Sequence, residues 1–313
     1  MPILQINALG GQLSLDQGKT TIEYALQHAL NAAGDGPIIL MVHGKNYAPK
    51  SPINDPHQHL YSLKRKPRHS RVISWPRHLG FGRRKTKHEG LAIGFAWDGE
   101  HNLWSAYQNA KLAGGCLAQL IKNIHQIAPK REINVITHSL GARVFLSALY
   151  DLPAGIKIRS VLLAPAETRE EADRAMQSPA AKTLQVINVT SRENDLFDFL
   201  LEWALRPFHL RSHALDHGLS TPSDRWLNLQ LDDPVTLHRL RNLGFPIAPT
   251  TLRVCHWFGY LRPGTFPLYQ ALFRREEGLS FSELTQALPQ QQSPRWSRIF
   301  ARNLTAKHLP VSR

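Results

Sequence analysis

The sequence predicts an α/β protein in which a doubly wound, mostly parallel sheet is flanked by helices. Two observations predict this class. Short apolar runs alternate along the chain with longer segments of helical periodicity. The runs are apolar throughout rather than at every second position, which is typical of strands buried on both faces of a parallel sheet.

The strands and helices follow one another in order. The expected strands are residues 36–44 (GPIILMVHG), 91–99 (LAIGFAWDG), 132–139 (EINVITHS), 158–166 (IRSVLLAPA), 183–191 (TLQVINVTS) and 251–257 (TLRVCHW). The expected helices are residues 20–33, 102–128, 141–152, 196–205 and 266–274. In such sheets the chemistry lies outside the carboxyl ends of the strands, so candidate residues are sought directly after each run.

Length and composition predict one domain. The chain has 313 residues, 42% of them apolar, which is enough for a single α/β domain over residues 1–313. We expect its core at about 36–270, with inserts at about 45–90 and 206–249. No stretch approaches the ~20 apolar residues of a membrane span, and the N-terminus has no secretory signal pattern. With only Cys116 and Cys255, a cytoplasmic location is expected.

The formal net charge of +14 is concentrated in residues 62–90. This basic run is either a solvated loop or a surface that attracts an anionic partner. Its basic residues are Lys64, Arg65, Lys66, Arg68, Arg83, Arg84, Lys85 and Lys87. No RNA- or DNA-binding motif accompanies them, so nucleic acid is disfavoured as a partner, while peripheral contact with a membrane stays open.

Ser139 stands between the expected strand 132–139 and the helix that begins at Gly141. A sharp strand–turn–helix corner exposes the side chain at its tip, and the N–H of Leu140 points the same way from the helix N-terminus. Such a corner provides a nucleophile and half of an oxyanion hole. A serine that merely caps the helix is the alternative interpretation.

Three further placements along the chain favour catalysis. His43 and Gly44 end an early strand, so the N–H of Lys45 can supply the second oxyanion donor. Asp195 follows the strand at 183–191, where a carboxylate can orient a histidine, with Glu193 and Asp198 as rivals. His256 ends the run 251–257 and completes the chain order Ser–Asp–His. His213, His217 and His238 also follow Asp195, but they lie in segments with loop or helix patterns.

This set of residues resembles the α/β-hydrolase superfamily, and its lipase- and esterase-type members in particular, over residues 36–269. The turn that carries Ser139, which corresponds to the nucleophile elbow of that family, departs from the pattern G-x-S-x-G, because Thr137 replaces the first glycine. The resemblance implies a serine hydrolase that cleaves an ester or related acyl bond, with Ser139, His256 and Asp195 as the triad. His43 is expected to stabilise its loop rather than act as a base.

The expected reaction needs no cofactor, and no metal-ligand motif is present. The expected substrate is a small-molecule or lipid-like acyl compound, with an anionic one favoured if the basic insert lies at the rim of the site. An acyltransferase on the same triad and a non-catalytic basic binding module on a hydrolase scaffold are the alternatives.

Overall fold

A mixed sheet with helices on both faces forms the framework of the protein in its computed structural model. The structure describes residues 3–18, 20–64, 72–82, 89–206, 213–274, 278–289 and 292–300. In these ranges, eight strands form one sheet in the order β2-β1-β4-β3-β5-β6-β7-β8. None of the helices in the same ranges has the length and apolar character needed to span a bilayer.

Parallel pairing dominates the sheet. The strands are β1 (Ile3–Leu9), β2 (Gln12–Leu15), β3 (Ile38–Val42), β4 (Leu91–Trp97), β5 (Ile133–His138), β6 (Ile158–Leu163), β7 (Leu184–Thr190) and β8 (Trp226–Gln230). All adjacent pairs are parallel except β1 and β2, which form a hairpin. Gly10 and Gly11 both have positive φ at its turn, which glycine adopts without strain.

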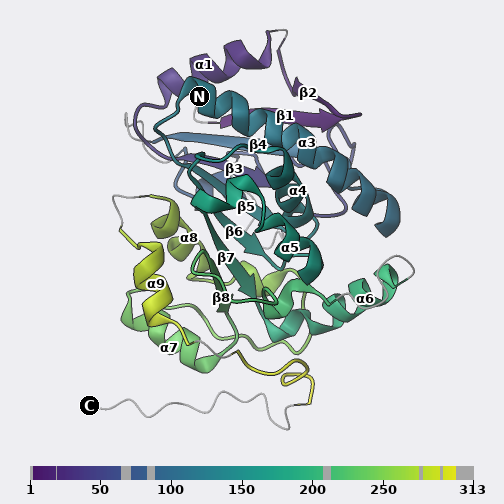
Figure 1. Ribbon diagram of the computed structural model, residues 1–313, viewed down its shortest axis with the longest axis vertical. Coiled ribbons are helices and arrows are strands. Elements are labelled where there is room, and N and C mark those ends of the chain that lie inside the picture. The colour runs from purple at the N-terminus through teal and green to yellow at the C-terminus, as the bar shows by residue number, and fades with distance from the viewer. Residues whose placement is uncertain are drawn as a thin grey trace.

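The helices cover the two faces of the sheet. They are α1 (Ile22–Ala32), α2 (Trp75–His78), α3 (Leu103–Ile127), α4 (Gly141–Ala148), α5 (Arg169–Ala175), α6 (Asp195–Leu205), α7 (Pro234–Asn242), α8 (Thr265–Phe273) and α9 (Phe281–Ala287). Figure 1 shows α3, α4 and α5 on one side of the sheet and α8 and α9 on the other. The predicted α/β class is confirmed.

Burial on both faces explains the continuous apolar runs. In β3, Ile38, Leu40 and Val42 belong to the core under α3 and α4, because successive side chains of a strand point to opposite faces. Ile39 and Met41 belong to the core under α8 and α9. Each face therefore needs apolar side chains, and the strand is apolar at every position.

The structure corrects one expected strand. Residues 251–257 are not a strand, and the sheet edge near them is occupied by β8, which falls inside the expected insert 206–249. Residues 251–254 are exposed, and the Cys255 N–H donates to the carbonyl of Glu193, which lies in the turn after β7. Tertiary context thus overrides the β-propensity of this run.

The basic run of residues 62–90 falls mostly on residues that the structure leaves undescribed. Lys64 is described and exposed. Arg65, Lys66, Arg68, Arg83, Arg84, Lys85 and Lys87 lie outside the described residues. The expectation that these side chains line the rim of the site therefore stays a prediction.

Candidate active site

Ser139 occupies a strained turn between β5 and α4. Its φ is +53°, a left-handed conformation that residues other than glycine rarely adopt. The Ser139 N–H donates to the carbonyl of Leu163 (3.0 Å), and its own carbonyl accepts from Ala142 (3.0 Å). These bonds hold the backbone on both sides of the turn, so the hydroxyl is presented to the cavity above the sheet.

Close packing beneath the turn requires glycine at position 141. A Cβ on Gly141 would lie 2.6 Å from the carbonyl oxygen of Val42 in β3. Thr137, by contrast, is accommodated: it pairs with Val42 and Leu162 in the sheet and does not need a positive φ. Of the two glycine positions in the G-x-S-x-G pattern, it is therefore the second one, Gly141, at which β3 leaves no room for a side chain.

His256 lies beside Ser139. Its Nε2 is 3.0 Å from Ser139 Oγ, although the two residues are 117 positions apart in sequence. The ring is also flanked by Phe197 of α6, at 4.9 Å between centroids. The histidine reaches this place from a loop, not from the strand that was expected to carry it. This distance allows the imidazole to accept the proton of the serine hydroxyl.

Asn194, and not Asp195, faces the second ring nitrogen of His256. Asn194 Oδ1 lies 2.6 Å from His256 Nδ1, and Asn194 Nδ2 donates to Asp198 Oδ1 at 2.8 Å. Because the amide nitrogen of Asn194 is directed to Asp198, its Oδ1 faces the ring, and since an amide oxygen can only accept, His256 Nδ1 carries the proton. Nε2 is then left free to accept from Ser139. The result is a hydrogen-bonded chain Ser139–His256–Asn194–Asp198.

The expected contact between Asp195 and His256 is therefore wrong, and helix geometry gives the reason. Asn194 ends a short 3₁₀ turn (Arg192–Asn194), whereas Asp195 begins α6. Successive residues of a helix are rotated by about 100°, so Asp195 turns away from the cavity. Its carboxylate instead lies 3.2 Å from Arg192 Nη1 and accepts from the backbone N–H of Trp296 at 2.5 Å.

The rival residues have other partners. Glu193 accepts from the hydroxyls of Ser191 and Thr250. His217 Nε2 lies 3.3 Å from Asp216 Oδ2. Among the histidines in the described ranges, His256 is the one that is hydrogen-bonded to Ser139. His213 and His238 do not line the cavity around the serine.

Burial holds the histidines of the site in the neutral form. It lowers the pKa of His256 to about 4, and no carboxylate of the described residues is hydrogen-bonded to the ring to oppose this shift. His138, whose ring centroid is 5.1 Å away, has a pKa well below its ordinary value because of burial and the nearby His256. At neutral pH, His256 is therefore unprotonated and able to accept a proton.

The loop after β3 packs directly on the elbow. A Cβ on Gly44 would lie 2.8 Å from Ser139 Cβ and 2.9 Å from the carbonyl oxygen of His138, so only glycine fits. This close approach brings the backbone of Lys45 to the wall of the same cavity, together with Leu140. Leu140 is the N-cap of α4, where backbone N–H groups have no partner within the helix. Both predicted oxyanion donors thus line the cavity with Ser139.

His43 secures this loop. Its Nε2 accepts from the backbone N–H of Trp97 at 3.0 Å, and its Nδ1 donates to the carbonyl of Gly44 at 2.7 Å. The imidazole also stacks on the Trp97 ring, with 5.4 Å between centroids. Burial lowers the pKa of His43 to about 3. These contacts agree with the expected loop-stabilising role.

The serine opens into a cavity of about 800 Å³. Its described wall is mostly apolar and carries a few polar groups. Besides Ser139, the residues of this wall are Lys45, Asn46, Tyr47, Asn54, Val72, Leu103, His138, Leu140, Ala166, Phe197, Leu200, Leu201, His256 and Trp257. The expected insert 45–90 contributes to this wall, as predicted for a loop that leaves the strand at the site. The described part of the insert 206–249 does not, and α6 lies there in its place.

A cluster of acids lies behind Asn194. Carboxylate oxygens of Asp195, Asp198 and Asp216 are all within 4.8 Å of one another and are buried, a grouping that could hold a cation. Arg192 Nη1 lies 3.2 Å from Asp195 and 3.0 Å from Asp216, so a guanidinium supplies the positive charge. Burial raises the pKa of Asp195 to about 6, and burial together with Asp216 raises that of Asp198 well above its ordinary value.

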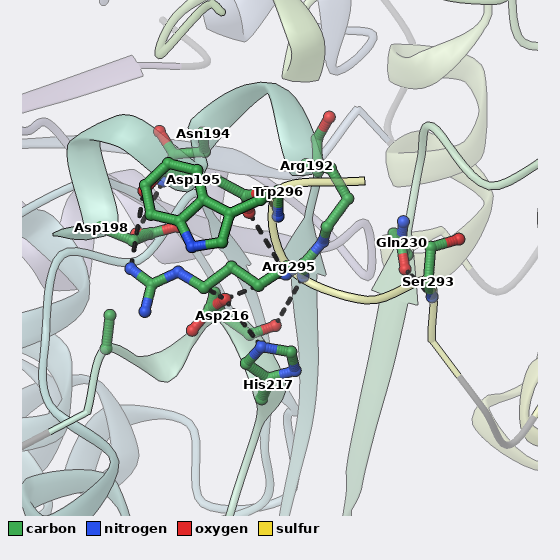
Figure 2. A network of polar contacts seen from close by, with 12 residues as sticks. Arg192, Asn194, Asp195, Asp198, Asp216, His217, Gln230, Ser293, Arg295 and Trp296 are labelled. Carbon is green, nitrogen blue, oxygen red and sulfur yellow. Dashed lines mark hydrogen bonds and ion pairs between the residues drawn. The ribbon is translucent and has the colours of Figure 1, made fainter. Parts of the chain in front are cut away.

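Residues 292–300, which we call the C-terminal strap, cover this cluster. Arg295 Nη1 donates to the two oxygens of Glu202 at 2.8 and 3.0 Å, and its guanidinium also approaches Asp216. The backbone N–H of Ser293 donates to Gln230 at 2.8 Å. Figure 2 shows Arg192 and Arg295 converging on Asp216, with Trp296 beside them. Sequence reasoning missed Arg295 because no local pattern links it to residues a hundred positions earlier.

Residues 19–196 match the model of a family described as an alpha/beta hydrolase of unknown function (DUF900). The match covers more than half of the chain, and it includes Lys45, Ser139 and Asn194 but ends before His256. No curated protein matches the chain.

Proposed function

The chain belongs to this family of alpha/beta hydrolases, and from that premise we propose that it cleaves acyl esters, with Ser139 as nucleophile and His256 as general base. The distance of 3.0 Å between Ser139 Oγ and His256 Nε2 is the observation that carries the proposal. It combines with a strained turn and an open cavity, which a capping serine does not require.

In the proposed reaction, Ser139 Oγ attacks the carbonyl carbon of the ester while His256 Nε2 takes the hydroxyl proton. A bond forms between Oγ and carbon, and the carbonyl π electrons move to oxygen. Collapse of this intermediate expels the alcohol, which receives the proton from His256. Water then attacks the acyl-enzyme by the same route in reverse, and an acid is released.

Asn194 has the role of orienting the base. Its amide oxygen holds the proton on His256 Nδ1, which keeps Nε2 available throughout. Asp198 fixes the amide in turn. The backbone N–H groups of Lys45 and Leu140 are the proposed donors to the oxyanion, where preorganised dipoles contribute strongly to catalysis.

The cavity wall supports an ester with an apolar acyl group. Val72, Leu103, Phe197, Leu200 and Leu201 lie around the serine. Burying a methylene group against such a wall contributes roughly 0.8 kcal/mol. We therefore expect kcat/KM to rise with acyl chain length until the cavity is filled.

The first test is replacement of the nucleophile. Ser139→Ala should lower kcat for a soluble p-nitrophenyl ester by ~10³-fold or more, because no other hydroxyl takes its place. A fluorophosphonate probe should label the wild-type protein at Ser139 and leave the variant unlabelled. Acyl esters of rising chain length then define the substrate range.

Ser147→Ala is the matched control, since Ser147 lies in the same helix, α4, but outside the cavity wall. It should retain both labelling and hydrolysis. Equal ester hydrolysis by a folded Ser139→Ala protein would reject the proposal.

A further inference from the structure

Helix α6 exposes large apolar side chains on its outer face, although Leu201 and Leu205 on its inner face already pack into the core. A helix on a globular protein normally turns its apolar side chains to the core and its charges to water. In α6 five large apolar side chains are between 37% and 64% exposed. They are Leu196, Phe197, Phe199, Leu200 and Trp203. Figure 1 shows α6 at the periphery of the molecule.

The acids of α6 point inward, and each has a partner there. Asp195 lies 3.2 Å from Arg192, and Glu202 accepts from Arg295 at 2.8 Å. Asp198 accepts from the amide of Asn194. The outer face of α6 therefore carries apolar groups with no carboxylate among them, and its C-terminal end is followed by the exposed Arg206.

Two neighbouring segments extend this apolar surface. Phe199 packs on Trp296 of the C-terminal strap, with 5.8 Å between ring centroids. The strap in turn lies along residues 250–254, since Arg298 Nε donates to the carbonyl of Leu252. Leu252, Val254 and Phe300 of these segments are also exposed apolar residues. We call α6 with these three residues the α6 surface.

The α6 surface continues into the candidate active site. Phe197 and Leu200 are exposed and also line the cavity that contains Ser139. The Phe197 ring lies 4.9 Å from that of His256. A long apolar chain could thus pass from the outer face of α6 to the serine without crossing a charged side chain of that helix.

Charge indicates which partner fits. Arg253 is exposed between Leu252 and Val254, and Arg206 is exposed at the end of α6. The whole chain carries a net charge of +14, so two copies that met through this surface would repel each other. An apolar helix face with basic residues around it suits the interface of a membrane that contains anionic lipids.

We propose that the α6 surface docks on an anionic lipid bilayer and admits the acyl chain of a membrane lipid to the cavity beside it. The docking follows from the exposed apolar face of α6 and its basic surroundings. The identification of a membrane acyl lipid as substrate rests on the proposed function. A contiguous apolar surface of this kind marks an interaction site on a soluble protein.

The test measures vesicle binding by flotation with full-length Ser139→Ala protein, so that binding does not depend on hydrolysis. Vesicles of phosphatidylcholine alone are compared with vesicles that also contain phosphatidylglycerol. Binding should be stronger to the mixed vesicles and should weaken as salt is raised. The double variant Leu196→Gln/Trp203→Gln, outside the cavity wall, should bind ~10-fold or more weakly, because two apolar groups no longer enter the interface.

The matched control is Leu112→Gln/Val235→Gln. Leu112 and Val235 are 65% and 51% exposed, and Trp203 and Leu196 are 64% and 37% exposed, so each double variant replaces one largely exposed and one partly exposed apolar side chain. The control should bind as well as the parent, and thermal unfolding of both variants checks that they are folded. Quenching of Trp203 emission by brominated lipid, lost in Trp203→Phe, would place α6 itself at the bilayer.

Three outcomes would overturn the docking proposal: no binding to either vesicle, equal losses in both double variants, or a dimer that only Leu196→Gln/Trp203→Gln dissociates. The last outcome would assign the α6 surface to contact between copies of the chain. Failure of docking with intact labelling of Ser139 leaves the hydrolase proposal standing. Absence of ester hydrolysis with intact docking rejects the hydrolase proposal alone.

Discussion

Asn194 supports His256 with an amide oxygen, which orients the ring but adds no negative charge next to it. Asp198, the acid that holds this amide, is separated from the imidazole by the amide group. The pKa of His256 consequently follows burial alone and falls to about 4. Because the amide carries no charge, it stabilises the imidazolium that forms in the transition state less than a carboxylate would. For the same reason His256 stays unprotonated in mild acid.

This arrangement predicts an unusual pH profile. Only unprotonated His256 can accept the serine proton, so kcat/KM for a soluble ester should stay level from pH 8 down to about 5 and fall with a midpoint of about 4. Asn194→Asp should move the midpoint upward by ~1–3 pH units, because a carboxylate 2.6 Å from Nδ1 favours the imidazolium. The measurement is the pH dependence of kcat/KM for both proteins.

Asp195→Asn is the control for that experiment. It keeps the group that accepts from Trp296 and removes a charge that does not contact His256. Its profile should retain the wild-type midpoint. A midpoint that responds to Asp195→Asn and ignores Asn194→Asp would show that Asp195 supports the histidine after all.

For Asn194 and Asp195, the sequence predicts the segment that supports His256 but not which of the two side chains faces the ring. The place of this segment after a strand predicts that it contributes to the site, and residue type alone favours the carboxylate of Asp195 over the amide of Asn194. Which of two adjacent side chains faces the cavity depends on where the 3₁₀ turn ends and α6 begins. Helix boundaries are set by tertiary contacts to within a residue or two, so this choice needed the structure.

At the scale of elements, the adjacent glycines of α3 meet different environments. A Cβ on Gly114 would lie 2.6 Å from Ser147 Cβ of α4, whereas one on Gly115 would have only Asp151 Oδ2 nearby, at 3.8 Å. Gly114 therefore sets the separation of α3 and α4, and through α4 the height of the elbow. Gly115 is exposed and has no such role.

The pair gives a prediction with an internal control. Gly114→Ala should lower the free energy of unfolding by ~1–3 kcal/mol, since the helices must move apart. Gly115→Ala should raise it by ~0.5–1 kcal/mol, because alanine is the better helix former. Urea denaturation of the two variants measures both. Changes of the same sign would contradict this packing of α3 on α4.

The central strands were predictable because each is apolar on both faces, and the helices between them have clear periodicity. β8 was missed although its sequence, WLNLQ, alternates as an edge strand does. The hairpin of β1 and β2 was missed although the pair Gly10-Gly11 is a recognised turn signal. The loop at 251–257 shows the opposite error: β-branched and apolar residues were present, but the sheet edge was already occupied.

At the scale of the whole molecule, the C-terminal strap ties the last described residues to α6 and β8. Arg295 is mostly buried against Glu202 and near Asp216, and it lies in the same acid cluster as Arg192. A cation in this place opposes the mutual repulsion of several buried carboxylates. Its loss would leave Glu202 and Asp216 with less compensation than the native protein provides.

Arg295→Met should therefore lower the free energy of unfolding by roughly 2–4 kcal/mol. Arg239→Met, at an exposed position of α7, should change it by less than about 0.5 kcal/mol. Denaturant titration near pH 7 is the measurement. Equal effects of the two substitutions would mean that the strap contributes nothing to the charge balance of the cluster.

The position of the C-terminal strap late in the sequence affects the order in which the acid cluster can be completed during translation. Trp296 and its partner Asp195 are 101 positions apart, and a ribosome delivers the chain from the N-terminus while earlier parts begin to fold. β5, α4, α6 and Arg192 all precede Arg295 in the chain, so the acids of the cluster and their first guanidinium partner are translated before the second one. The hydrogen-bonded chain behind His256 therefore acquires its resting charge state late in synthesis, after Arg295 has been translated.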